Sequence, residues 1–109
     1  MDREFLMPRF EHRVSYWGKA EVEHHATTGA TVLVSYGRRV CFVDARGRFH
    51  RAWGDWSRTT GRPIVEFYRQ FCGSGPVPHK AAWDALPVED VHGTARAALA
   101  DVLSTEARP

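Results

Sequence analysis

The sequence has no apolar run of about 18 residues, which a membrane-spanning helix requires. The first ten residues, MDREFLMPRF, carry acidic side chains and no long apolar stretch, so we expect no secretory signal and a cytoplasmic protein. Cysteine is scarce: Cys41 and Cys72 stand alone and lack CxxC spacing. This pattern predicts two reduced core thiols and excludes a disulfide framework.

The common signatures of metal and nucleotide sites are also missing. The six histidines include no HxxxH or HExxH pair, and no GxxxxGK[ST] loop occurs. We therefore expect no metal site and no cofactor. His24, His25 and His50 remain candidates for ligand contact or proton transfer, and no nucleophile with a partnered base is visible.

Lysine is rare and arginine is abundant. Only Lys19 and Lys80 are lysines among 15 basic residues, and the net charge is +2. Residues 31–70 hold eight arginines against three carboxylates, a local charge of +5. Arginine presents a planar fork of donors that matches phosphate or carboxylate, so this segment predicts a negatively charged partner. A genome with GC-rich codons is an alternative cause of the bias.

The 109 residues predict a single domain of the α+β class. Residues 1–55 are expected to be mainly β and residues 57–105 mainly α, with an N-terminal antiparallel meander of 4–5 strands packed by 2–3 C-terminal helices. Alternation with period two predicts strands over RFEHRVSYW (9–17), KAEVEH (19–24) and RFHRAW (48–53), and β-branched and aromatic residues predict strands over TVLVSY (31–36) and RVCFVD (39–44).

The clearest hairpin joins residues 31–36 to 39–44. A two-residue type II′ loop at Gly37-Arg38 pairs Tyr36 with Arg39, Val34 with Cys41 and Val32 with Val43. Both faces of these strands are apolar, which predicts a central pair covered on each side. Residues 48–53 carry arginines on both faces and are expected near an edge of the sheet.

Helical spacing begins after residue 60. An apolar stripe at i, i+3, i+4 and i+7 predicts a helix, followed by a short helix over HKAAWDAL with Trp83 and Leu86 inward. Pro87 is expected in the first turn of the last helix. The stripes are Ile64, Phe67, Tyr68 and Phe71 in the first of these helices, and Val88, Val91, Ala95, Leu99, Val102 and Leu103 in the last.

The segment DWSRTTGRP, residues 55–63, precedes the first helix. Thr60, or else Thr59, is the expected N-cap, with Pro63 in the first turn. The remaining hydroxyls, together with Arg58 and Arg62, suit an anion seat at a helix N-terminus. The alternative is a plain cap with solvated arginines.

Aromatic side chains lie between the arginines: Tyr36, Phe49, Trp53 and Trp56. Single-stranded nucleic acid stacks its bases on such rings while guanidinium groups hold its phosphates. Protein interfaces use the same residue types as hot spots. Alternatively, Phe49 and Trp53 belong to the core and Trp56 anchors the loop below the helix.

Residues 34–67 resemble a short pattern in uncharacterised small proteins of bacteriophages and other mobile elements, in which a SYxxxVxFxD hairpin leads to an aromatic-Ser-x-Thr-Thr-x-basic helix start. The resemblance covers about a third of the chain and implies a mobile-element origin and a hairpin-to-helix fold, but no activity. Pro63 stands where the pattern has histidine, so no role of that histidine carries over. The matching residues are Ser35, Tyr36, Val40, Phe42, Asp44, Trp56, Ser57, Thr59, Thr60 and Arg62.

The leading hypothesis is a non-enzymatic binder of nucleic acid or of a host nucleoprotein complex, and by analogy an inhibitor of a host defence system such as CRISPR. One alternative is a small enzyme that holds a phosphate-bearing substrate at residues 57–62 and uses His50 as acid–base group. Another is an oligomeric interaction module. The predicted binding surface comprises Arg38, Arg39, Arg48, Arg51, Trp56, Ser57, Arg58, Thr60 and Arg62.

Overall fold

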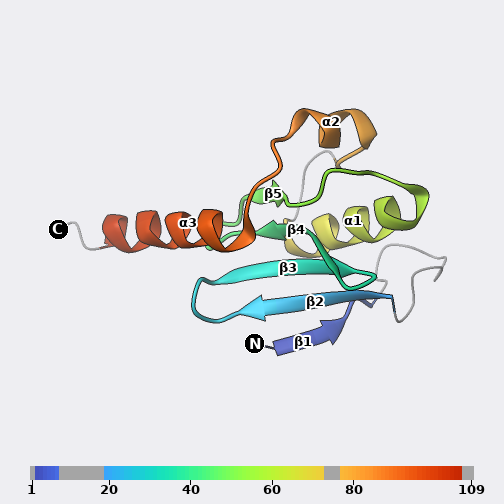
Figure 1. Cartoon of the computed structure of the whole chain (residues 1–109). Helices are drawn as coiled ribbons and strands as arrows, with labels where there is room; N and C mark the ends of the chain where they lie inside the picture. The colour runs from blue at the N-terminus through green and yellow to red at the C-terminus, as the bar shows by residue number, and fades with distance from the viewer. Residues whose placement is uncertain (1, 8–18, 73–76, 107–109) are drawn as a thin grey trace.

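A five-stranded antiparallel sheet followed by three helices forms the protein, as the sequence predicts for an α+β fold (Figure 1). The computed structural model describes residues 2–7, 19–72 and 77–106. The strands lie in sequence order, β1-β2-β3-β4-β5. Their bounds are Asp2–Phe5 for β1, Ala20–His25 for β2, Ala30–Ser35 for β3, Arg38–Val43 for β4 and Phe49–Arg51 for β5.

The first strand was not expected. The sequence DREF has little strand character, and all four side chains of β1 are exposed. Pairing creates the strand: β1 runs antiparallel to β2, with Asp2 opposite His24 and Phe5 opposite Glu21. The strand predicted over residues 9–17 lies outside the described residues.

The β3–β4 hairpin differs from the prediction by one residue. Its turn consists of Tyr36 and Gly37, both with positive φ (52° and 78°), which is a type I′ turn. Ser35 therefore lies opposite Arg38, and Val34 lies opposite Arg39. A bulge between Leu33 and Val34 shifts the register, so Leu33 pairs with Cys41. The predicted pairs were wrong because the turn begins one residue earlier than Gly37.

The prediction of a central strand pair covered on both faces is confirmed. One face of the sheet packs against α1 (Arg58–Phe71), through Leu33 and Cys41 against Ile64 and Phe67. The opposite face packs against α3 (Val91–Glu106); the buried residues there are Ala30, Val32, Phe42, Val91 and Ala95. Strands buried on both faces need apolar residues at every position, which explains the weak alternation of β3 and β4.

Strand β5 forms the edge of the sheet opposite β1. The segment around α2 (Lys80–Ala85) lies beyond β5 in Figure 1. Trp83 is fully buried, as predicted. Arg51 of β5 forms a parallel bridge with Val88, which extends the edge by one residue.

Both long helices begin elsewhere than predicted. The stripe from Ile64 to Phe71 is only the second half of α1, which starts at Arg58. Helix α3 starts at Val91, not near Pro87, because the Asp90 carboxylate accepts a hydrogen bond of 2.8 Å from the Gly93 amide in the manner of an N-cap. The C-terminal part of α3 reaches past the sheet, and Leu103 is exposed there (Figure 1).

Candidate functional site

The first turn of α1 is closed by a reciprocal cap between Ser57 and Thr60. The Ser57 hydroxyl accepts a hydrogen bond from the Thr60 amide (3.3 Å), and the Thr60 hydroxyl accepts one from the Ser57 amide (2.9 Å). Ser57 is therefore the N-cap, and the prediction of Thr60 or Thr59 was wrong. A capping box occupies the N-cap and N3 side chains, so neither hydroxyl is surplus to capping.

Pro63 lies inside α1, as its sixth residue, and is buried. The sequence predicted it in the first turn, because proline has no N–H to donate to the carbonyl four residues earlier. The helix loses that one hydrogen bond at its N-terminal end. Proline is most readily accommodated at the first helical position, and Pro63 lies five residues after that position.

Gly61 and Trp56 are in close contact on the outer side of this turn. A methyl group placed on Gly61 would lie 3.0 Å from the Trp56 ring. The same ring lies 5.6 Å, between centroids, from the ring of Trp83. Trp56 is thus half-buried between α1 and the core, and it anchors the loop while exposing part of its indole.

We expect Gly61→Ala to lower the free energy of unfolding by about 1–2 kcal/mol, because the displaced indole costs more than the helix propensity gained. Chemical denaturation followed by tryptophan fluorescence measures this difference. Gly54→Ala is the matched control, since a methyl group there meets no atom within 4 Å. Equal stability of the Gly61→Ala and Gly54→Ala variants would contradict the close packing of Trp56.

A pocket of about 380 Å³ lies on the Trp56 side of the first turn of α1, and we call it the outer pocket. Arg62 and Arg69 are exposed on it, seven residues apart and so on one face of the helix. Its lining comprises Trp56, Ser57, Gly61, Arg62, Val65, Glu66 and Arg69. One aromatic ring and two guanidinium groups therefore share a concave surface.

A second pocket, of about 430 Å³, lies between the same turn and the β3–β4 hairpin, and we call it the hairpin pocket. Arg38 places its guanidinium 5.5 Å from the centre of the Trp53 ring. Ser57 lines both pockets, so they are adjacent. The lining residues are Ser35, Tyr36, Arg38, Val40, Trp53, Asp55, Ser57 and Thr60.

Five of the nine predicted site residues therefore come together: Arg38, Trp56, Ser57, Thr60 and Arg62. Ser35, Asp55 and Arg69 also line the pockets and were not part of the predicted binding surface. Arg69 could have been predicted from the sequence, because its spacing of seven residues from Arg62 puts both on one helical face. No sequence pattern pointed to Ser35 or Asp55, because the hairpin register and the path of the loop bring them to the pocket. The Arg58 side chain lies outside the part of the chain that the structure describes.

Arg51 is not available for binding. Its side chain is buried, and the guanidinium donates hydrogen bonds to the carbonyls of Trp53 (2.9 Å), Trp83 (3.0 Å) and Leu86 (2.9 Å), and also to that of Gly54. These bonds join β5 to the end of α2. Arg51 therefore does not belong to the binding surface, and its prediction as a binding residue was wrong.

Arg39 belongs to an ion cluster around the buried carboxylate of Glu23, which no local sequence pattern predicted. Its Nε donates to Glu23 of β2 over 2.9 Å, and Arg3 and His25 also contact the Glu23 carboxylate. The Glu23 side chain has no exposed surface. Burial alone would raise the pKa of Glu23, but hydrogen bonds from Arg39, Arg3 and His25 outweigh it and lower the pKa to about 2.

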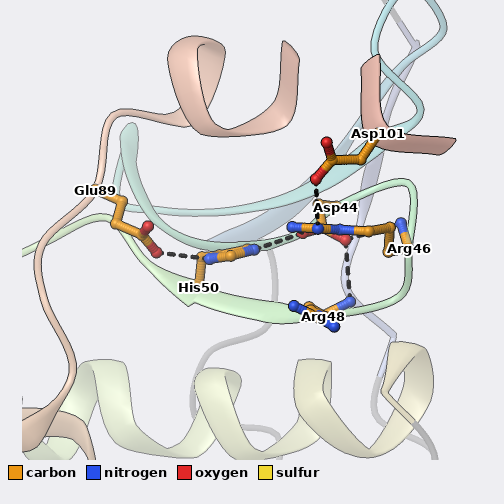
Figure 2. A network of polar contacts seen from close by, with 6 residues as sticks. All are labelled: Asp44, Arg46, Arg48, His50, Glu89 and Asp101. Atoms are coloured by element: carbon orange, nitrogen blue, oxygen red, sulfur yellow. Dashed lines mark hydrogen bonds and ion pairs between the residues drawn. The ribbon is translucent and has the colours of Figure 1, made fainter. Parts of the chain in front are cut away.

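Arg48 lies at the β4–β5 turn, beside a second polar network (Figure 2). His50 contacts Asp44 through Nε2 and Glu89 through Nδ1, each over 2.6 Å. Burial raises the pKa of Asp44, but hydrogen bonds from His50 and from the amides of Arg48 and Arg46 lower it below its usual value. Arg46 in turn contacts Asp101 of α3 over 2.9 Å.

The residues that the enzyme hypothesis requires lie on opposite faces of the sheet. The His50 ring stacks on Phe42 at 4.9 Å, on the face of the sheet that α3 covers. Ser57 and Thr60 lie with Val40 on the face that α1 covers. His50 is therefore not placed to transfer a proton to a ligand held at residues 57–62.

Neither cysteine has the character of a nucleophile. Both are free thiols, and burial raises the pKa of Cys41 well above its usual value and that of Cys72 to about 11. Among residues 2–7, 19–72 and 77–106, no three His, Cys, Asp or Glu side chains gather as metal ligands would. Within the same ranges, no helix has the length and apolar character to cross a membrane.

The fold and the two pockets define a small α+β protein with an arginine- and tryptophan-lined surface around one helix N-terminus. The chain belongs to a family of unknown function, DUF8033, whose model matches residues 6–85. Both pockets lie within the matched residues, whereas α3 lies outside them. No curated protein and no solved structure matches the chain.

Proposed function

We propose that this protein is a non-enzymatic module that binds single-stranded nucleic acid across the outer and hairpin pockets. The observation that carries the proposal is the adjacency of the two pockets around Ser57, each lined by tryptophan and arginine. Single strands are held by rings that stack on bases and by cations that follow the phosphates. Pockets that continue into one another suit a chain of repeating bases and phosphates.

The exposed groups of the hairpin tip support this proposal. Tyr36 is 55% exposed although it is aromatic, and its φ of 52° is unfavourable for a residue with a side chain. Backbone strain of this kind concentrates at functional sites. Lys19 lies 5.8 Å from the centre of the Tyr36 ring, and Arg38 stacks on Trp53 nearby. A base that approaches this tip meets rings and positive charge together.

The distribution of arginines supports it further. Arg39 pairs with the buried carboxylate of Glu23, Arg51 is buried and bonded to backbone carbonyls, and Arg46 contacts carboxylates of the network in Figure 2. The arginines that line the two pockets, Arg38, Arg62 and Arg69, are exposed to solvent, although Arg62 also has an interaction within the protein. Arg38 and Arg62 lie near the N-terminus of α1, whose partial positive charge adds to theirs, whereas Arg69 lies in the last turn of the helix. A phosphate backbone is the ligand that such a field attracts.

The resemblance to phage and mobile-element proteins extends the proposal. In that setting the bound strand would belong to a host nucleoprotein complex, and binding would inhibit a host defence system such as CRISPR. A small module that covers an exposed strand blocks base pairing without performing any chemistry. The host cytoplasm is the corresponding compartment.

The double variant Arg38→Ala/Arg62→Ala is expected to weaken binding to a single-stranded RNA or DNA of about 12 nucleotides by roughly 10-fold or more at low salt. Each lost phosphate contact reduces the slope of log K against log salt by about 0.7, so we expect a slope lower by about 1.4. Fluorescence anisotropy at several salt concentrations measures both quantities.

Arg48→Ala/Arg96→Ala is the control for this experiment. It removes the same charge from exposed positions outside both pockets, and we expect its salt slope to equal that of the wild type. An equal loss of affinity in the two double variants would mean that binding depends only on net charge, and it would contradict the proposed surface. Salt-independent self-association without strand binding would instead favour the oligomeric module.

A further inference from the structure

One buried polar group in the hairpin pocket has no partner. Ser35 is 3% exposed, and its hydroxyl is the single buried side-chain polar atom without a hydrogen bond in the part of the chain that the structure describes. Buried hydroxyls in folded proteins are almost always hydrogen-bonded, because desolvation without a partner is unfavourable. Ser35 lines the pocket, and its hydroxyl is covered by neighbouring atoms, so a ligand that displaces those atoms on entry can supply the missing bond.

The remaining lining describes the shape of that ligand. Trp53 and Tyr36 offer flat aromatic surfaces, and Val40 adds an apolar contact. A volume of about 430 Å³ lies within the usual range for small-molecule sites, about 300–1,000 Å³. A planar heterocycle of nucleobase size therefore fits better than a sugar or a bare phosphate.

The polar groups narrow the choice of base. Asp55 brings a carboxylate, which only accepts hydrogen bonds, and Ser35 brings a hydroxyl, which can donate. Guanine presents two neighbouring donors, N1–H and the N2 amino group, beside the acceptor O6. Adenine, cytosine and uracil lack that pair of adjacent donors. Arg38 at the same pocket matches the acceptors of guanine or a neighbouring phosphate.

We propose that the hairpin pocket takes one unpaired guanine base, with the Ser35 hydroxyl donating to O6 and Asp55 accepting from N1–H and N2. This inference rests on the proposed binding of single strands and adds base recognition to it. The outer pocket then holds the neighbouring part of the strand without reading its sequence.

The test uses neutral nucleosides, because they carry no phosphate and so separate base recognition from charge. We expect guanosine to bind in NMR titrations at least about 5-fold more tightly than adenosine, cytidine or uridine, the difference that one or two hydrogen bonds supply. Ser35→Ala should weaken guanosine binding about 5- to 10-fold. Its midpoint of thermal unfolding should be unchanged or higher, because the lost hydroxyl had no partner.

Ser104→Ala, an exposed serine of α3, is the matched control and should bind guanosine as the wild type does. Asp55→Asn should reduce the preference for guanosine, because an amide presents a donor where the base also donates. The base-recognition proposal is overturned by equal affinity for guanosine and uridine, by unchanged binding in Ser35→Ala, or by a markedly lower midpoint in that variant.

The failure of each proposal has its own signature. Oligonucleotide binding with the expected salt slope, but without a guanosine preference, overturns base recognition and leaves strand binding in place. Guanosine binding without oligonucleotide binding overturns strand binding and leaves a guanine-specific pocket.

Discussion

Replacement of Arg51 by methionine is expected to lower the free energy of unfolding by about 3–5 kcal/mol, a large part of the total for a domain of this size. The guanidinium satisfies carbonyls of Trp53, Trp83 and Leu86, and it lies 5.4 Å from the centre of the Trp83 ring. Methionine fills much of the volume but leaves those buried carbonyls without donors. Chemical denaturation followed by circular dichroism measures the change.

Arg51→Lys separates hydrogen bonding from charge. Lysine keeps the positive charge, but one ammonium group cannot reach carbonyls on both sides as the guanidinium fork does, so we expect most of the loss to remain. Arg48→Met is the surface control and should change stability by less than about 0.5 kcal/mol. A stable Arg51→Met variant would mean that Arg51 does not hold α2 against β5, and it would return Arg51 to the candidate surface.

Glu23→Gln is expected to lower the free energy of unfolding by about 3 kcal/mol at neutral pH, because Arg3 and Arg39 then lose the charge of the fully buried carboxylate with which they pair. The exposed Glu4 of the neighbouring strand provides the control: Glu4→Gln should cost less than about 0.5 kcal/mol. Urea titrations of the three proteins give the comparison.

The lowered pKa of Glu23 also makes the stability of the protein depend on pH. The pKa of Glu23 falls from 4.5 to about 2 on folding, so its contribution is complete above about pH 4.5 and is lost as the pH falls toward 2. The shift corresponds to roughly 3 kcal/mol. Wild type should lose that much more stability than Glu23→Gln over this range, while Asp44, whose pKa is also lowered, accounts for a remaining decline in both proteins.

These two predictions concern charges that lie inside the fold, and they bear on the proposed function. A chain with a charge of +5 in residues 31–70 suggests one broad basic surface. Arg39 and Arg51 instead stabilise the sheet and its edge. The surface that remains for a nucleic acid is smaller, and it is centred on Arg38 and Arg62 at the first turn of α1.

Local patterns were sufficient to predict the fold class and the elements from β2 to α3, whereas β1 was not predicted. Alternation over residues 19–24 and apolar character on both faces of residues 31–36 and 39–44 reflect burial that repeats along each strand, so they are visible in the sequence. The stripe from Ile64 to Phe71 and the burial of Trp83 follow from the same kind of regularity. Element boundaries depended on single hydrogen bonds, such as those of Ser57 and Asp90, and were less predictable.

The roles of the individual arginines could not be read from local patterns. The carbonyls of α2 and its C-cap that accept hydrogen bonds from Arg51 lie 32 to 35 residues further along the chain, and the carboxylate that engages Arg39 lies 16 residues before it. The position of Ser35 in the hairpin pocket depended on a turn that starts at Tyr36, one residue before the glycine. Periodicity reports which face of an element is buried, whereas the partner of a polar side chain is set by which distant segments the folded chain brings within hydrogen-bond distance.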